Sequence, residues 1–215
     1  MRGAYEFTLA GASLLALPSG AVWWPDAAAL AMSDLHFGRA ERAARQGGAL
    51  LPPFDAAETL ARLDADLAAT RARTVICVGD AFDHVTSGLA EADGLWLARL
   101  AAGRRWIWIA GNHDPGPMDV PGEHLAELRL GPLSFRHIAL AGADGEVSGH
   151  YHPKARVAGQ ARRCFLLDAT RLILPAYGAY AGGLRSDDAA LAALMGAGAL
   201  AILTGRTCLP VPMPR

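Results

Sequence analysis

Apolar residues in this chain occur in short runs separated by turn residues, a pattern typical of β-strands in a layered fold. Small turn residues interrupt the runs near the N-terminus, at Gly11 and at Ser19-Gly20. Longer apolar runs with β-branched residues then predict buried strands in the middle of the chain. The strands expected in this first part cover residues 5–9, 13–17, 21–24, 28–32, 74–78 and 106–110.

Helices are expected between and after these strands because leucines recur there at helical spacing. Leu60, Leu63 and Leu67 lie three or four positions apart, and Asp55 followed by Glu58 resembles a capping box. The other expected helices cover residues 89–101 and 187–197, the second with Ser186 as its N-cap.

Beyond residue 128 the pattern predicts β-hairpins joined by turn residues. Strand–helix alternation followed by hairpins predicts two mixed sheets packed together, with helices outside. We therefore expect one α/β domain over residues 1–215. The expected hairpins pair residues 128–130 with 133–137, 163–167 with 171–174, and 200–203 with 207–211.

Composition narrows the class of protein without indicating a function. Apolar residues make up 52% of the 215 residues, which excludes a disordered chain. The formal net charge of −1 gives no overall attraction to nucleic acid, so any polyanion would have to bind a local patch. Cys77, Cys164 and Cys208 are expected to be reduced core thiols, as in a cytoplasmic protein. The sequence has neither a signal-peptide pattern nor an apolar run of ~18 residues, so we expect no membrane association.

Four polar clusters follow extended segments, and they carry the candidate chemistry. In layered α/β folds, ligands gather at the carboxyl ends of strands. The last cluster is Gly149-His150-Tyr151-His152, and in an extended segment His150 and His152 would point to one face, side by side. Two imidazoles held that close favour a cation between them. The other three clusters are Ser33–His36, Gly79–Asp83 and Gly111–Asp114.

Together with His137, these clusters supply the mixed oxygen and nitrogen donors that suit metal ions. Seven ligands are too many for one ion, but they suit two ions about 3.5–4 Å apart that share a carboxylate. Asp80 is the expected bridge, because a carboxylate has two oxygens and Gly79 allows a tight turn before it. Mixed ligation without cysteine favours Mn²⁺, with Fe²⁺ or Zn²⁺ also compatible. The seven candidate ligands are Asp34, His36, Asp80, Asn112, His137, His150 and His152.

The order of these blocks resembles that of the calcineurin-like metallophosphoesterases. That family carries D-x-H, G-D-x-x-D, G-N-H-[DE], a later lone histidine and G-H-x-H, and all five blocks occur here in this order between residues 34 and 152. Trp24-Pro25, Arg136-His137 and residues 174–183 further resemble the bacterial ligase-associated DNA damage response endonucleases. The resemblance implies a four-layer α/β/β/α sandwich.

The resemblance also implies a role for each block. His113 would face the substrate as a proton donor or charge stabiliser, and Asp83 would orient His113 or support the ligands. Position 83 is often histidine in nuclease-like relatives, whereas here Asp83 is followed by His84, so the roles of these two residues are open. The first metal would be held by Asp34, His36, Asp80 and His152, and the second by Asp80, Asn112, His137 and His150.

Residues outside the blocks have both functional and structural interpretations. Arg39, Arg42 and Arg45 at helical spacing form either a phosphate-facing stripe or a solvated helix face, and we favour Arg39 as a substrate contact. His84 and Tyr177 are further candidate substrate contacts. For the remaining residues a structural interpretation is favoured: a solvated strand for Lys154 and Arg156, a surface histidine in a short helix for His124, and core packing for Trp23, Trp24, Trp106 and Trp108.

The expected function is a two-metal phosphodiesterase in which a metal-bridging hydroxide attacks phosphorus in line. The resemblance implies a DNA endonuclease or other nuclease linked to repair, with single-stranded DNA as substrate and a helicase and a DNA ligase as partners. Alternative substrates are small nucleotides or a nucleotide-diphosphate lipid. The non-enzymatic alternative is a metal-free scaffold of the same fold; it predicts missing ligands, yet every ligand position is filled.

Overall fold

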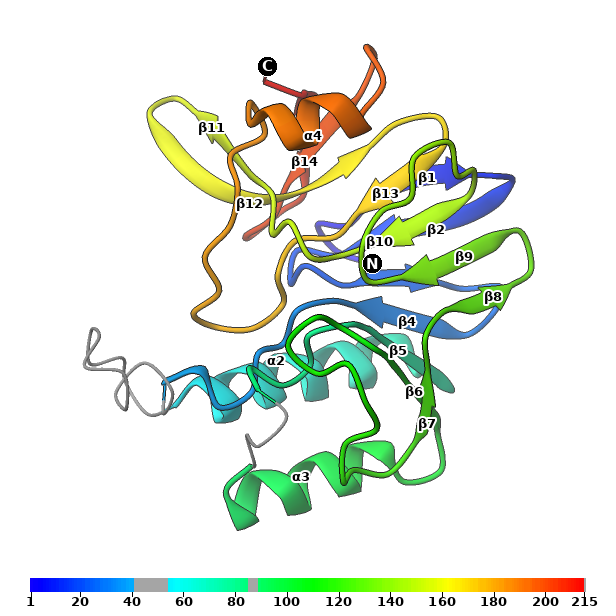
Figure 1. Ribbon diagram of the computed structural model, residues 1–215, viewed down its shortest axis with the longest axis vertical. Helices are drawn as coiled ribbons and strands as arrows, with labels where there is room; N and C mark the ends of the chain where they lie inside the picture. The colour runs from blue at the N-terminus through cyan, green and yellow to red at the C-terminus, as the bar shows by residue number, and fades with distance from the viewer. Residues whose placement is uncertain (41–53, 85–88, 215) are drawn as a thin grey trace.

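Two mixed β-sheets lie face to face in the computed structural model, which describes residues 1–40, 54–84 and 89–214. Two helices cover the outer face of the first sheet, and one short helix covers the outer face of the second (Figure 1). The result is four layers, helix–sheet–sheet–helix. This arrangement confirms the predicted α/β/β/α sandwich with mixed sheets.

The first sheet combines an antiparallel half with a parallel half. Strands β1 to β4 pair antiparallel, whereas β4 to β7 pair parallel. Strands β4, β5 and β6 are buried on both faces, because helices and the second sheet cover them, and they read as continuous apolar runs. In spatial order the strands are β1 (Tyr5–Leu9), β2 (Ala12–Ala16), β3 (Val22–Trp24), β4 (Ala29–Met32), β5 (Thr74–Val78), β6 (Arg105–Ile109) and β7 (Glu123–Leu125).

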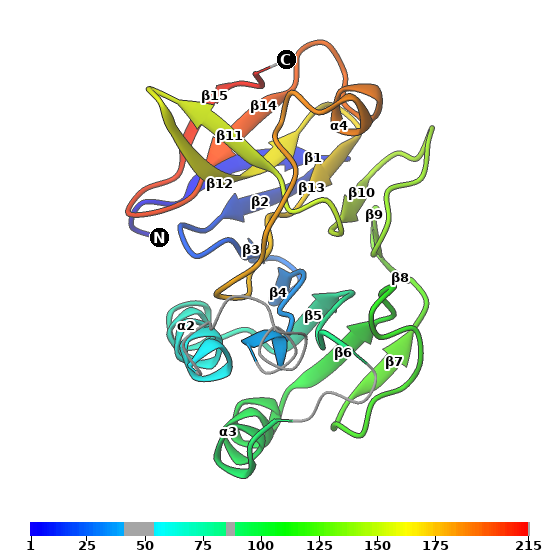
Figure 2. The same cartoon turned by 60° about the vertical axis from the view of Figure 1, so that its left-hand side comes forward.

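The second sheet is mostly antiparallel. Only β10 pairs parallel, with β9 on one side and β13 on the other. A hairpin formed by β11 and β12 extends this sheet beyond the main path (Figure 2). The strands are, in spatial order, β15 (Leu209–Pro212), β14 (Leu200–Leu203), β12 (Gln160–Leu167), β13 (Arg171–Ile173), β10 (Glu146–Ser148), β9 (Leu133–Arg136) and β8 (Leu128–Leu130), with β11 (Lys154–Val157) paired to β12.

The helices bury leucine stripes against the sheets. Helix α2 (Asp55–Thr70) packs Leu60, Leu63 and Leu67 onto the first sheet, as the spacing predicts, and α3 (Glu91–Ala101) packs beside it. Helix α4 (Ala189–Leu194) covers the second sheet through Leu191. The core between the two sheets is built from residues of both, among them Phe165 and Val147, which are fully buried. This double support fixes the strand ends that carry the polar clusters.

Helix ends depart from the sequence-based expectation. The capping box at Asp55 is wrong: Asp55 is the first helical residue, and its carboxylate accepts the backbone N–H of Ala40 at 3.1 Å. Helix α4 is shorter than predicted, and its N-cap is Asp188, not Ser186, because the Asp188 side chain accepts the N–H of Ala190. Serine and aspartate are both favoured N-cap residues, so the sequence pattern did not distinguish Ser186 from Asp188.

Two further differences concern histidines. The predicted short helix around His124 is strand β7, and His124 is half-buried with its ring stacked on Trp108. The extended backbone expected at His150 and His152 is also wrong, because both residues lie outside any strand and have positive φ, 71° and 47°. Strand β7 covers three residues, and so short a segment has no periodicity that would distinguish a strand from a helical turn.

The remaining predictions on core residues agree with the structure. Trp24, Trp106 and Trp108 are buried, and Trp23 is half-buried against the helices. The cysteines Cys77, Cys164 and Cys208 are buried free thiols, as expected. In the described part of the chain, none of the helices combines the length and apolar character needed to cross a bilayer.

Phe165→Ala should lower the free energy of unfolding by about 3–5 kcal/mol, because it removes a fully buried ring from the core between the sheets. Phe54→Ala is the matched control, since that ring is 65% exposed and its removal leaves no cavity. Chemical denaturation of both variants measures the difference. Equal losses of stability would contradict this description of the core.

Candidate active site

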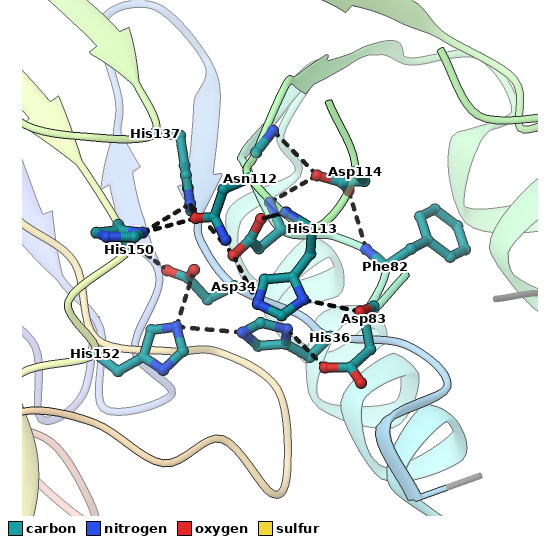
Figure 3. Close-up of polar contacts among 12 residues, drawn as sticks. Asp34, His36, Phe82, Asp83, Asn112, His113, Asp114, His137, His150 and His152 are labelled. Carbon is teal, nitrogen blue, oxygen red and sulfur yellow. Dashed lines mark hydrogen bonds and ion pairs between the residues drawn. The ribbon is translucent and has the colours of Figure 1, made fainter. Parts of the chain in front are cut away.

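The predicted ligands come together at the carboxyl ends of five strands from both sheets (Figure 3). Strands β4, β5 and β6 of the first sheet and β9 and β10 of the second each end in a loop that contributes side chains. In chain order, these loops supply Asp34 and His36, Asp80 and Asp83, Asn112 and His113, His137, and finally His150 and His152.

One cluster consists of Asp34, His36 and His152. The Nε2 atoms of His36 and His152 lie 3.2 Å apart, and His152 Nε2 lies 3.0 Å from Asp34 Oδ1. The carboxylate of Asp34 is fully buried. Donor atoms of all three residues therefore converge within the reach of a single ion.

A second cluster consists of Asp80, Asn112, His137 and His150. Asn112 Oδ1 lies 3.0 Å from His137 Nε2 and 2.8 Å from His150 Nδ1, while the two ring nitrogens are 3.2 Å apart. Asp80 Oδ2 completes the group at 3.3 Å from His137 Nε2. His150 and His152 thus belong to different clusters, and the expected side-by-side arrangement is wrong.

The donor atoms in these clusters fit metal ions better than they fit one another. Two neutral imidazole nitrogens in contact can share one proton at most, and the adjacent carboxylates have none to give. Asp34 Oδ1 is buried, and its polar neighbour is His152 Nε2, the same nitrogen that faces His36 Nε2. Buried acceptors without donors are costly, and a divalent cation at each cluster removes that cost.

The protonation behaviour of the site points the same way. Burial raises the pKa of Asp80, but its hydrogen bond to His137 and the charge of that imidazole outweigh burial and lower the pKa to about 2. Burial lowers the pKa of His137, yet Asp80 and Asp34 raise it above its usual value. A proton on His137 is stabilised here because the carboxylates favour positive charge. Burial and the charge of His137 lower the pKa of His150, which keeps that ring neutral with a free lone pair.

Strained backbone marks the same residues. Nine non-glycine residues of the described chain have positive φ, and five of them are candidate ligands. Each such conformation costs of order 1 kcal/mol or more, and it persists only where the surroundings enforce it. The strained ligands are Asp34 (55°), His36 (50°), Asp80 (47°), His150 (71°) and His152 (47°).

Glycines before the ligands allow the loops to approach closely. A Cβ atom at Gly149 would lie 1.7 Å from Ser33 Oγ and 2.6 Å from Asp34 Oδ2. A Cβ atom at Gly79 would lie 2.1 Å from His137 Nδ1. Space beside the ligands, as much as backbone freedom, therefore requires glycine at these positions.

Asp114 ties two of the loops together, a role that the sequence did not reveal. Its buried carboxylate accepts backbone N–H groups from Asp80 (3.1 Å), Phe82 (3.1 Å) and Gly111 (3.0 Å). Its position at the end of the G-N-H-D block was visible in the sequence, but spacing alone does not show which carboxylate faces a backbone. Ser33 has a similar role beside Asp34, with its hydroxyl 2.7 Å from the carbonyl oxygen of Val78.

Asp83 and His113 meet through the backbone. His113 Nδ1 lies 2.9 Å from the Asp83 carbonyl oxygen, which can only accept, so Nδ1 carries the proton. The second nitrogen, Nε2, lies 4.0 Å from Asp80 Oδ2 on a half-exposed side chain. The Asp83 carboxylate is instead 3.2 Å from His36 Nδ1. Carboxylates in this position fix the tautomer of a metal-binding imidazole, so that its other nitrogen faces the metal.

A strap formed by residues 176–179 supports the Asp34 loop from the second sheet. Tyr177 and Gly178 donate backbone N–H groups to the carbonyl oxygens of Ser33 and Asp34. Arg163 of β12 donates to two strap carbonyls, Ala176 (3.1 Å) and Ala179 (2.7 Å). Arg62 of α2 also donates to the strap, at the carbonyl oxygen of Tyr177. Figures 1 and 2 show this segment reaching from the second sheet down to α2.

The three candidate substrate contacts have different surroundings. Arg39 is partly exposed, with Nη1 3.6 Å from Asp83 Oδ1. His84 is exposed directly after Asp83. Tyr177 is fully buried, with its hydroxyl donated to Asp66 at 2.8 Å, so the predicted direct contact between Tyr177 and a substrate is wrong. Arg42 and Arg45 lie outside the described residues.

A family model for the calcineurin-like phosphoesterases matches residues 28–185, which include all the ligand candidates. The chain belongs to this family. It is therefore a metal-dependent phosphoesterase, and the two clusters are where divalent ions are expected.

Among solved structures, the crystal structure of the nuclease MPE from Pseudomonas putida is similar to this phosphoesterase over nearly the whole chain. The TM-score is 0.77 at 28% sequence identity, and the match covers 97% of this chain and 100% of the other. No curated protein matches the chain.

Gly149→Ala should lower the free energy of unfolding by about 1–3 kcal/mol, because the new methyl group overlaps Ser33 and Asp34. Gly198→Ala is the control: nothing lies within 4 Å of its added Cβ, so a change within about 0.5 kcal/mol is expected. Both variants are unfolded in the presence of a chelator, so that metal binding makes no contribution. A Gly149 variant as stable as the control would contradict the close approach of the loops.

Proposed function

We propose that this phosphoesterase is a two-metal nuclease that cleaves phosphodiester bonds in DNA, with single-stranded DNA as the expected substrate. The observation that carries the proposal is the pair of adjacent donor clusters, in each of which carboxylate and imidazole atoms converge within reach of one ion. The similarity to a nuclease supports a nucleic-acid substrate. Links to DNA repair, to a helicase and a ligase, and to the cytoplasm stay predictions from the sequence.

Each cluster would hold one divalent ion. Asp34, His36 and His152 would bind the first, and Asn112, His137 and His150 the second. Asp80 is the expected shared ligand, since a carboxylate has two oxygens and Oδ2 lies 3.3 Å from His137 Nε2 in the second cluster. Two divalent ions supply an activated water and neutralise the charge of the phosphate. Nitrogen and oxygen donors without sulfur favour Mn²⁺, with Fe²⁺ or Zn²⁺ compatible.

The protein supplies the proton for the leaving group. Because His113 Nδ1 donates to the Asp83 carbonyl, only Nε2 is free to face the substrate. A protonated His113 would give its Nε2 proton to the departing oxygen. Asp83 acts on the same loops as a positioning residue, through its carbonyl on His113 and its carboxylate on His36.

Metal dependence tests the proposal directly. Chelated protein should not hydrolyse bis(p-nitrophenyl) phosphate, and added Mn²⁺ should restore turnover. Elemental analysis should find two metals per wild-type chain, and fewer in Asn112→Ala and His150→Ala, which should also lose hydrolysis. Wild-type turnover in either variant would refute the ligand assignment.

A panel of substrates separates the nuclease from the alternatives. With Mn²⁺ present, single-stranded DNA should be cleaved, and duplex DNA, RNA, small nucleotides and a nucleotide-diphosphate lipid are the comparisons. Cleavage of the small molecules alone would overturn the nuclease proposal while leaving the phosphoesterase assignment intact.

His113→Ala should lower kcat by roughly 10²–10⁴, the usual contribution of a positioned proton donor. Its metal content should stay at the wild-type value, because His113 belongs to neither ligand set. His124→Ala is the matched control, since His124 lies on β7 against Trp108 and should leave kcat unchanged. Loss of metal from the His113 variant would show that this residue is a ligand.

A further inference from the structure

We infer that Lys154, with Arg39 and Arg163 beside it, forms a subsite for a second phosphate of the substrate next to the metal centre. The inference rests on the proposed nuclease function and deepens it. It makes the preferred substrate a polynucleotide chain, whose phosphates follow one another, rather than an isolated phosphodiester.

The first supporting feature is the register of the β11–β12 hairpin. Lys154 lies directly opposite Arg163 on the neighbouring antiparallel strand. Residues directly opposite one another point to the same face of a sheet, and like charges in such a pair are destabilising. The two positive charges repel each other in the free protein, and a bound anion would remove this repulsion.

The second feature is a cation contributed by the first sheet. Arg39 follows the Asp34 loop, and its guanidinium lies 3.6 Å from the Asp83 carboxylate beside His36. Lys154 follows His152 by two residues, and the His152 ring lies 3.2 Å from that of His36. Two segments distant in sequence, the loop after β4 and the β11–β12 hairpin, therefore bring cations next to the cluster that contains His36 and His152.

Among these cations, Lys154 is the one available to a ligand. Arg163 donates to the carbonyls of Ala176 and Ala179, and Arg39 faces Asp83. Within residues 1–40, 54–84 and 89–214, no carboxylate lies within ion-pair distance of the Lys154 ammonium group. A compact, mobile ammonium on a four-carbon stem suits a phosphate oxygen.

The Lys154 ammonium group is close enough in the chain to the candidate ligand His152 to reach the phosphate next to the one that is cleaved. Lys154 is two residues beyond His152, so their Cα atoms are at most roughly 7 Å apart. Its backbone is fixed on both sides, because its N–H donates to Leu184 and its carbonyl oxygen accepts from Ser186. A solvated lysine at a strand end would need neither this anchoring nor the opposing arginine.

The test compares two substrates that contain the same diester. A thymidylyl dinucleotide has one phosphate, whereas a single-stranded oligothymidylate has further phosphates on either side. In Lys154→Gln, the ratio of kcat/KM for the oligonucleotide to kcat/KM for the dinucleotide should fall about fivefold relative to wild type. Lys154→Arg keeps the charge and should keep most of the ratio.

Arg156→Gln is the matched control. Arg156 points to the same face of β11 two residues further along, is exposed, and donates to the Gly159 carbonyl oxygen at 3.2 Å. Its removal should leave the ratio at the wild-type value. The salt dependence of oligonucleotide cleavage gives a second readout: the slope of log(kcat/KM) against log[salt] should become shallower by roughly 0.7 in Lys154→Gln alone.

The outcomes distinguish this inference from the function on which it rests. A lowered ratio and shallower slope in Lys154→Gln, with both substrates cleaved by wild type, support the subsite. An unchanged ratio with active wild-type enzyme overturns the subsite and leaves the nuclease in place. Absence of cleavage of both nucleic-acid substrates by metal-loaded wild type overturns the nuclease proposal, and the subsite with it.

Discussion

The Nε2 atoms of His36 and His152 lie 3.2 Å apart beside a buried carboxylate, and the rest of the site depends on how the fold holds such atoms together. Two neutral imidazole nitrogens in contact share one proton at most, so these side chains would separate if their backbones were free. They are not free, because each loop is tied to a neighbouring loop. The Asp34 N–H donates to the Gly79 carbonyl oxygen at 3.1 Å, and the Gly149 N–H donates to that of His137 at 3.0 Å.

These ties make the site a property of the two-sheet sandwich. Candidate ligands after β4, β5 and β6 belong to the first sheet, and those after β9 and β10 belong to the second. The strap from Ala176 to Ala179 is tied to both layers, because Arg163 of β12 and Arg62 of α2 donate to its carbonyl oxygens. A relative movement of the sheets would therefore separate the ligands. Preorganisation of this kind lets a site bind metal without first ordering its loops.

Much of this arrangement could be predicted from the sequence. Apolar runs located the strands, and the polar residues after each run are the ones that the structure brings together, because strand ends on one edge of a sheet lie together. The sequence pattern gave wrong predictions where a residue can adopt more than one backbone conformation. At His150 and His152 the alternation rule assumed extended backbone, whereas glycines and loop-to-loop hydrogen bonds hold both residues in the left-handed region.

Tertiary partners explain the other misses. The Asp114 carboxylate accepts three backbone N–H groups, and the buried Tyr177 donates its hydroxyl to Asp66. The spacing of neighbouring residues in the sequence predicts neither contact. A carboxylate that follows G-N-H could serve equally as a ligand or a cap, and a tyrosine in a glycine-rich segment could point either way. Only the packing of distant elements decides such cases.

The distribution of charge connects the site to its substrate. The net charge of −1 provides no general attraction to a polyanion, so local fields must provide it. Arg163 is half-buried, and its described hydrogen bonds go to the carbonyl oxygens of Ala176 and Ala179, which leave its positive charge in place. Its positive field therefore adds to that of Lys154 and Arg39 on the side where divalent ions would bind. The positive charges of these three residues and of divalent ions at the site would repel one another, and a bound anion would reduce that repulsion. A substrate with several phosphates relieves this repulsion at more than one point, whereas a single diester relieves it only at the metals.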